Sequence, residues 1–514
     1  MIDRFRNRPR TTLPYSGGMG ERKLTEPFRE SGDWYLPNNK ENSLSGELIY
    51  EPGESLRLEL VGRFRRDPNE AFNLESVPTI LGELSNQYVT LYQCERTNLS
   101  VNIPGKGRSV FQPRFALFGA HDKSLEQPDV SCLIVRIPEL EEWLLRCGLS
   151  GLAASMHTTE TGSDEFGGAM FKYEPRNNTA IQINGTLLEL VPGVKVSGIG
   201  PSTVGFASLQ EQVQLRFVFA EEIPFTEALD RYLSPLVDFS NLVTGSSSRS
   251  TSISIKEDLD IGQGRTIPQT FPVVFNNGWL GEPSDLGTTS RIDQYLVDPH
   301  GLSQEQLIEL VQSWFASYQQ YERSMHLTFG IERAPTGTYA EVRFVTLCHA
   351  AEALHRDSEL SQFNYTEAEY KQLRDEAITH VQDEDLKAFM KGQLRFARDV
   401  TLRQRMFALR EAAVGSDSEL FPDRVLGAIV KTRNTVTHGR SKDVRTKVDT
   451  FDMYYFSEYL SWLIRGVILR NLGWQHGEIV ALLASDSRVG RLNERLAAGE
   501  ISCLEAEASD SDGI

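Results

Sequence analysis

The sequence predicts an α+β protein of several domains, in which a β-sandwich-like region is followed by an all-helical region. From about 44 to 299 apolar and polar residues alternate, as at Leu56, Leu58 and Leu60, which is the period of a strand with one buried face. From about 300 to 500 apolar residues recur every three or four positions, which is the period of a helix. The length of 514 residues is typical of about two to four domains.

The changes of pattern divide the chain into four segments. They are a flexible N-terminal arm (1–43), a β-rich domain (44–299), a helical domain (300–500) and an acidic disordered tail (501–514). The arm is rich in Arg, Pro, Gly and Ser and has little periodicity. The tail alternates acidic and small residues, a composition that cannot bury an apolar core.

The sequence predicts one hairpin in the β-rich domain with defined bounds. Residues 46–50 and 56–64 alternate like strands, and a turn is expected between them. The apolar run 132–135 predicts a strand buried on both faces, and a helix is expected near 226–242. These patterns do not distinguish a β-sandwich from two packed β lobes.

Helix starts in the second half are marked by a Ser or Thr with Glu or Gln three residues later, the pattern of a capping box. Six helices are expected: one after Ser303, one from Thr338 to about His355, one from Thr366, one over about Asp385 to Glu411, one that includes 433–438, and one over about Thr450 to Asn471.

The net charge of −18 disfavours non-specific binding of nucleic acid by the whole molecule. One segment differs, because between 431 and 447 cations outnumber acids. Its basic residues, apart from the arginine discussed below, are Lys431, Arg440, Lys442, Arg445 and Lys447, and its acid is Asp443. We expect these five cations to contact RNA, although a solvated basic loop would have the same composition.

Five scattered cysteines without a CxxC pair predict a reducing, cytoplasmic location. No secretory signal is expected at the N-terminus. The apolar stretch 459–474 is interrupted by Arg465 and Arg470, so no membrane span is expected. Nucleotide-binding glycine motifs are absent from the sequence, and we expect no cofactor.

The motif R-N-x-x-x-H at Arg433, Asn434 and His438 is the main candidate for chemistry. A histidine transfers protons near neutral pH, and a guanidinium binds phosphate oxygens with two parallel hydrogen bonds. Asn434 can bind a phosphate or orient either neighbour. An arginine and a histidine at this spacing can form a minimal metal-free site for RNA cleavage. The alternative is a solvated helix end whose cations complement the helix dipole.

Helical geometry constrains this site. Five residues at 100° each place positions 433 and 438 about 140° apart around a straight helix, whereas positions 434 and 438 share a face. A symmetric dimer removes the difficulty, because two copies can pool side chains across a twofold axis. We therefore expect a homodimer or a higher homo-oligomer.

Glu352 lies among alanines on the helix expected at 338–355, so a buried carboxylate there needs a partner. Arg433 and His438 are candidates, and an unrelated arginine is the alternative. His349 and His355 flank Glu352, but their spacing matches neither H-E-x-x-H nor H-x-x-E-H. We therefore expect no metal site and interpret both histidines as core or helix-surface residues.

Two segments resemble a known family. R-F-x-x-L-x-x-A-x-E-A-L-H-R, within 341–356, resembles the opening helix of the ApeA-like HEPN domain. The segment 44–64 is similar to the start of the ApeA N-terminal domain found with it. The resemblance implies a bacterial anti-phage effector with a dimeric HEPN ribonuclease and an N-terminal sensor or regulatory domain.

The sequence and the resemblance together predict a metal-independent endoribonuclease of abortive infection, with Arg433, Asn434 and His438 as catalytic residues and Glu352 as a weaker candidate. Its expected partners are RNA, with tRNA loops a plausible substrate, a second copy of the chain, and a phage-derived trigger bound by the N-terminal domain. Two other functions stay open: a HEPN scaffold that holds RNA or a partner without cutting, and a ligand-binding β protein with a helical oligomerisation domain.

Overall fold

We describe a computed structural model of the chain. It describes residues 11–12 and 22–500, apart from 53, 55, 65–75, 101–106, 123–125, 146–148, 159–163, 174–176, 198–207, 246, 261–265, 276–294, 335–336, 359, 361–362, 364, 395–398, 417–418 and 439–448. The chain divides into two compact units, Met1–Gln312 and Ser313–Ile514, and each is described by itself. The predicted acidic tail, 501–514, lies outside the described residues.

The first unit is built on one continuous antiparallel sheet, in which the described strands number thirteen. In sheet order they are β13 (Thr179–Ile183), β14 (Thr186–Ser197), β15 (Ser208–Pro224), β10 (Asp129–Arg136), β16 (Ser252–Asp260), β17 (Thr266–Phe275), β8 (Phe115–Phe118), β6 (Tyr88–Ser100), β5 (Ser76–Leu84), β2 (Phe28–Tyr35), β3 (Leu44–Tyr50), β4 (Arg57–Val61) and β7 (Arg108–Gln112). Two smaller pairs join β1 (Thr11–Thr12) to β9 (Ala120–His121) and β11 (Leu149–Thr158) to β12 (Asp164–Tyr173).

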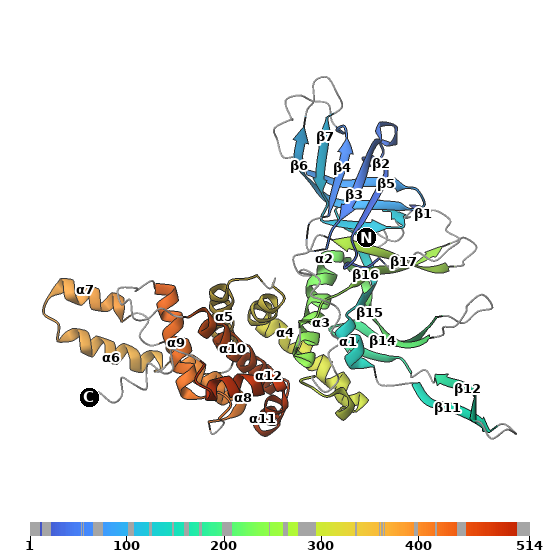
Figure 1. Cartoon of the computed structure of the whole chain (residues 1–514). Helices are drawn as coiled ribbons and strands as arrows, with labels where there is room; N and C mark the ends of the chain where they lie inside the picture. Colours follow the sequence, from blue (N-terminus) through green and yellow to red (C-terminus); the bar gives the residue numbers. More distant parts are fainter. Residues whose placement is uncertain are drawn as a thin grey trace. The chain divides into compact units, whose positions relative to one another are not determined.

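One end of this sheet closes on itself. β6 pairs with β5 along one edge and with β7 along the other, so the strands β6, β5, β2, β3, β4 and β7 form a ring (Figure 1). Trp34, Leu48, Leu58 and Phe111 are buried as its core. Gly82 is required inside the ring, because a Cβ there would overlap the indole of Trp34.

The strand-rich character of the first half is confirmed. The predicted hairpin is also confirmed, since β3 pairs with β4 from Gly46 opposite Leu60 to Ile49 opposite Arg57. The predicted arm, 1–43, is wrong for its last part, because β2 lies in it and is paired on both sides. The closure of the ring depends on the long-range pairing of β6 with β7, which local alternation does not encode.

A short helical segment interrupts the strands where the sequence predicted a helix. It consists of α2 (Phe225–Ala228), the π-helical turn η3 (Leu229–Leu233) and α3 (Ser234–Thr244). All residues of α3 are buried, and Phe239 packs edge-on against Trp143 of α1 (Pro138–Leu144) with 5.9 Å between the ring centroids. The helix is therefore an internal part of this unit.

The second unit is helical. Its described helices are α4 (Gln304–Glu332), which crosses the boundary between the units, α5 (Ala340–Asp357), α6 (Glu367–Thr379), α7 (Glu384–Gln393), α8 (Leu402–Val414), α9 (Asp423–His438), α10 (Thr450–Asn471), α11 (His476–Ser485) and α12 (Ser487–Ala497). The overall α+β class, with strands first and a helical domain second, is thus confirmed. Within the described residues no helix combines the length and apolar character that a bilayer span needs.

Several predicted helix starts are confirmed. Ser303 Oγ accepts the backbone N–H of Gln306 ahead of α4, and Thr366 forms a full capping box with Glu369. The helix predicted at Thr450 to Asn471 has those bounds, with Asp449 as its N-cap.

Two predicted helices are corrected. The helix expected from Thr338 begins at Ala340, and its N-cap Tyr339 makes no side-chain hydrogen bond. The helix expected over 385–411 is two helices, because Thr401 and Gln404 form a second capping box that starts α8.

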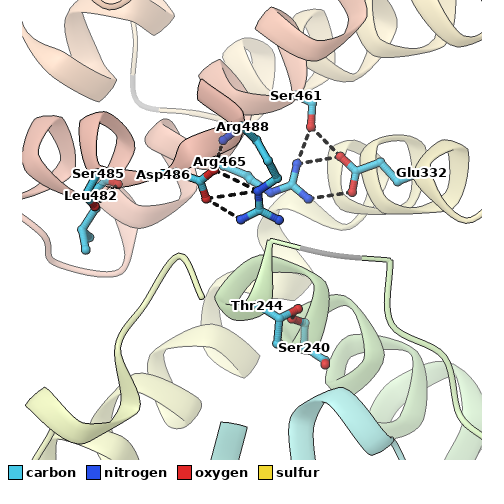
Figure 2. Close-up of polar contacts among 9 residues, drawn as sticks. All are labelled: Ser240, Thr244, Glu332, Ser461, Arg465, Leu482, Ser485, Asp486 and Arg488. Carbon is cyan, nitrogen blue, oxygen red and sulfur yellow. Dashed lines mark hydrogen bonds and ion pairs between the residues drawn. The ribbon is translucent and has the colours of Figure 1, made fainter. Parts of the chain in front are cut away.

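A buried charge network links two helices of the second unit. Arg465 of α10 donates to both carboxylate oxygens of Glu332 at the end of α4, at 2.6 and 2.7 Å, and Ser461 donates to the same carboxylate (Figure 2). Burial opposes the charged form of Glu332, but the charge and hydrogen bonds of Arg465 outweigh it and lower its pKa. Arg488 of α12 pairs with Asp486 beside them (Figure 2). The network fixes the end of α4 against α10.

Candidate active site

The R-N-x-x-x-H motif lies at the C-terminal end of α9. This helix is held in the bundle by an apolar face that includes Val425, Leu426 and Ile429, all buried. Arg433 and Asn434 lie in its last two turns, and His438 is its last residue. Arg433 lies one turn after Ile429 on this packed side of the helix, whereas Asn434 is exposed.

Arg433 is fixed by a carboxylate from another helix. Its Nη2 donates to Oε1 of Glu352 on α5 at 2.9 Å, and the two side chains are 18% and 19% exposed. Its Nη1 donates to Oδ1 of Asn434 at 3.4 Å. Its Nε is buried and has no hydrogen-bond partner among the described residues. Of the partners considered for Glu352, the structure shows Arg433.

Two other side chains of α5 near this ion pair are buried. Cys348, one turn before Glu352, is buried, and burial, with the nearby charge of Glu352, raises the pKa of its thiol. His355 is also buried, and its Nδ1 lies 3.1 Å from Nη1 of Arg405, which is a donor in every protonation state. Glu352 therefore lies between buried neighbours on its own helix and interacts with arginines of α8 and α9.

The two histidines that flank Glu352 point to different environments. His349 is exposed, whereas His355 is buried against Arg405. Across the described parts of the chain, no three His, Cys, Asp or Glu side chains are grouped so that they could hold a metal ion.

Part of the predicted site lies beyond what the structure describes. The backbone of His438 ends α9, but its side chain is outside the described atoms. The predicted RNA-binding residues Arg440, Lys442, Arg445 and Lys447 fall in the gap 439–448. Lys431 is described, and it is exposed one turn before Thr435 on α9.

An open cavity of about 560 Å³ lies beside the motif. Its lining is Arg403, Asp423, Arg424, Gly427, Val430, Lys431, Asn434 and Thr435. Three cations face one acid there, and that acid, Asp423, is paired with Arg410. The motif residue Asn434 thus shares a cavity with the cations of α8 and α9, which suits a polyanion.

Lys431 was predicted from the sequence, whereas Arg403 and Arg424 were not. Arg424 could have been found, because 424, 427, 431 and 434 recur with helical spacing on one face of α9. Arg403 comes from α8, and only the tertiary packing of α8 against α9 brings it to the cavity.

The helical domain carries Arg433 and His438 near the end of α9, and comparison with known families assigns this domain to the HEPN class. Residues 345–478 match the Apea-like HEPN family, and residues 29–284 match ApeA N-terminal domain 1. The chain therefore belongs to the ApeA-like HEPN proteins, which at the level of the family are nucleases of anti-phage defence. No curated protein and no solved structure matches the chain significantly.

Proposed function

We propose that this protein is a metal-independent endoribonuclease that acts in abortive infection. One observation carries the proposal: the Arg433 guanidinium is held by Glu352 and by Asn434, and Asn434 lines a cationic cavity. A guanidinium positioned in advance can stabilise charge that develops on a phosphate without reorganising during the reaction.

The reaction needs only RNA and the protein. His438 removes the proton of a ribose 2′-OH, and the 2′-oxygen attacks the adjacent phosphorus. Arg433 stabilises the negative charge on the phosphoryl oxygens. The bond from phosphorus to the 5′-oxygen breaks, and that oxygen takes a proton. The products are a 2′,3′-cyclic phosphate and a 5′-hydroxyl end.

The proposed homodimer brings together residues that this reaction needs. Positions 433 and 438 lie about 140° apart around a straight helix, so a straight α9 does not place them on one face. A homodimer would place His438 of one copy near Arg433 of the other. The exposed Lys431 and the four cations of the following segment would then guide RNA to the paired helices.

The second candidate function is a HEPN scaffold that binds RNA without cutting. The observation in its favour is that Arg433 is already paired and only 18% exposed, as expected of a residue that joins α9 to α5. The two functions differ in one result, because a scaffold would leave RNA intact.

Chelation provides the first test. Purified protein that cuts total bacterial RNA should do so equally well in excess EDTA, because Arg433 and His438 replace the metal as charge stabiliser and proton carrier. Cleavage would be followed by gel electrophoresis with and without added Mg²⁺. Loss of cutting in EDTA with recovery on addition of a divalent ion would contradict this mechanism.

We also propose that the β-rich domain restrains the helical domain until a phage-derived trigger binds to it. A bound trigger needs only to shift an existing equilibrium between an inactive and an active dimer. Expression of residues 300–514, which keeps α4 whole, should then be more toxic to bacteria than expression of the full chain. His438→Ala should remove the toxicity. Colony counts after induction measure both, and a harmless dimeric fragment would indicate that the β-rich domain activates the nuclease.

A further inference from the structure

A second open cavity, of about 950 Å³, adjoins the first. The helices α8, α9, α11 and α12 contribute its walls, and Asp423 and Arg424 line both cavities. Since α9 begins at Asp423 and reaches Asn434 in the first cavity, the two cavities follow this helix from its first turn to the motif. The candidate site therefore has a neighbouring space in the size range of ligand pockets.

We propose that the second cavity binds the nucleotides next to the bond that is cut, so that single-stranded RNA follows α9 from Asn434 toward α11 and α12. The inference rests on the proposed function, because it takes the motif as the point of cleavage. It adds a binding site on residues that the motif does not include, and it assigns to them a substrate class, an unpaired RNA segment.

Arg410 is the central residue of this site. Its side chain is 13% exposed, and its Nε is buried without a hydrogen-bond partner in the described chain. One nitrogen, Nη1, donates to Asp423. Arg410 lines the cavity, and its guanidinium has donors besides the one that Asp423 accepts, from which a phosphate oxygen in the cavity would accept hydrogen bonds.

The aromatic ring of Phe407 contacts two arginines of α8, Arg403 and Arg410. The guanidinium of Arg403 lies 5.1 Å from the centroid of this ring, and that of Arg410 lies 5.4 Å from it. Arg403 lines the first cavity and Arg410 the second. One aromatic ring thus holds a cation for each cavity, as a strand with several phosphates requires.

The rest of the second cavity suits a base better than a bare anion. Apolar side chains form part of its wall, among them Val414, Leu420 and Val480. Asn493 accepts a hydrogen bond from Tyr459 at 3.0 Å, and its amide nitrogen makes none within the described residues. Burial raises the pKa of Tyr459 to about 12, so its hydroxyl keeps its proton and fixes the Asn493 amide. The amide nitrogen can then donate to a base, which single-stranded RNA exposes.

A variant of Asp423 distinguishes a change in RNA binding from a folding defect. Asp423 is the acid shared by both cavities, and it holds one nitrogen of Arg410. Replacing it by asparagine removes a charge that repels phosphate and frees Arg410. Asp423→Asn should therefore bind RNA more tightly, a change that a folding defect does not produce.

The experiment measures binding in the full chain that carries His438→Ala, so that the RNA stays intact. The probe is a fluorescent single-stranded RNA of about twelve nucleotides, a length that can span several phosphate contacts, and Kd is read by anisotropy at several salt concentrations. Arg410→Gln should raise Kd roughly tenfold and reduce the salt dependence by about one released ion. Asp423→Asn should lower Kd about threefold. The matched control Arg374→Gln removes an equal charge from α6, where Arg374 pairs with its neighbour Asp375, and should leave Kd unchanged.

Unchanged Kd in both Arg410→Gln and Asp423→Asn would overturn the inference and would leave the second cavity to another occupant, such as a peptide. Weaker binding by Asp423→Asn would overturn it as well. These outcomes are independent of cleavage. If His438→Ala still cut RNA, the proposed function would fail while the binding site stood.

Discussion

Replacing His438 by alanine is expected to lower the rate of RNA cleavage by about 10²- to 10⁴-fold, the range that general acid–base catalysis supplies. The residue ends α9, where the apolar face of the helix is already anchored by residues such as Ile429, so the fold should persist. The rate would be measured on a labelled RNA, with thermal unfolding as the check on the fold. His349→Ala is the matched control, because it removes an exposed histidine from α5.

Arg433→Lys extends this test to the charge-stabilising residue. Lysine has the same charge as arginine but lacks the planar group that binds two phosphate oxygens. The rate of RNA cleavage should therefore fall strongly, although the net charge of the protein is unchanged. A His438→Ala variant that cuts RNA at the wild-type rate would place the chemistry elsewhere. Equal losses in His438→Ala and His349→Ala would indicate a general defect of the helical domain.

Replacing Glu352 by alanine is expected to lower kcat by about 10²-fold, because small displacements of a positioned group have effects of that size. Among the described residues, Glu352 is the ion-pair partner of Arg433, at 2.9 Å. Without it the guanidinium keeps only the weaker contact with Asn434 at 3.4 Å. Glu352→Gln retains an oxygen that can accept from Arg433 and should lose less activity than Glu352→Ala.

The comparison of kcat with KM distinguishes positioning from folding. Loss of position should lower kcat with little effect on KM, whereas partial unfolding would lower the amount of active protein and the melting temperature together. Glu376→Ala, which removes an exposed carboxylate from α6, is the control for the change of net charge. Full activity of Glu352→Ala would mean that the ion pair only joins α5 to α9.

Local signals in the sequence predicted most of the helical domain. Thr366 with Glu369 and the start at Thr450 were found because capping is decided within one turn. The break between α7 and α8 was missed, although Thr401 with Gln404 has the same capping pattern, because the apolar period continues across it. Local chemistry therefore predicts helix starts better than periodicity predicts helix ends.

Long-range features were harder to predict. The pairing of Glu352 with Arg433 joins residues 81 positions apart, and it could be named only because a carboxylate among alanines needs a partner. The ring closed by β6 and β7 and the approach of Arg403 to α9 had no comparable local constraint. Strand alternation fixes which face is buried but not which strands are neighbours.

The central claim is that the 2′-OH of the substrate is the nucleophile and that His438 activates it. The most direct measurement uses a short DNA strand with one ribonucleotide at the position of cleavage, treated with the full chain in EDTA, and identifies the product ends by mass spectrometry. Cleavage should occur only after that ribonucleotide, give a 2′,3′-cyclic phosphate and a 5′-hydroxyl, and disappear in His438→Ala. Cleavage of the all-DNA strand, or products with a 5′-phosphate, would contradict the mechanism.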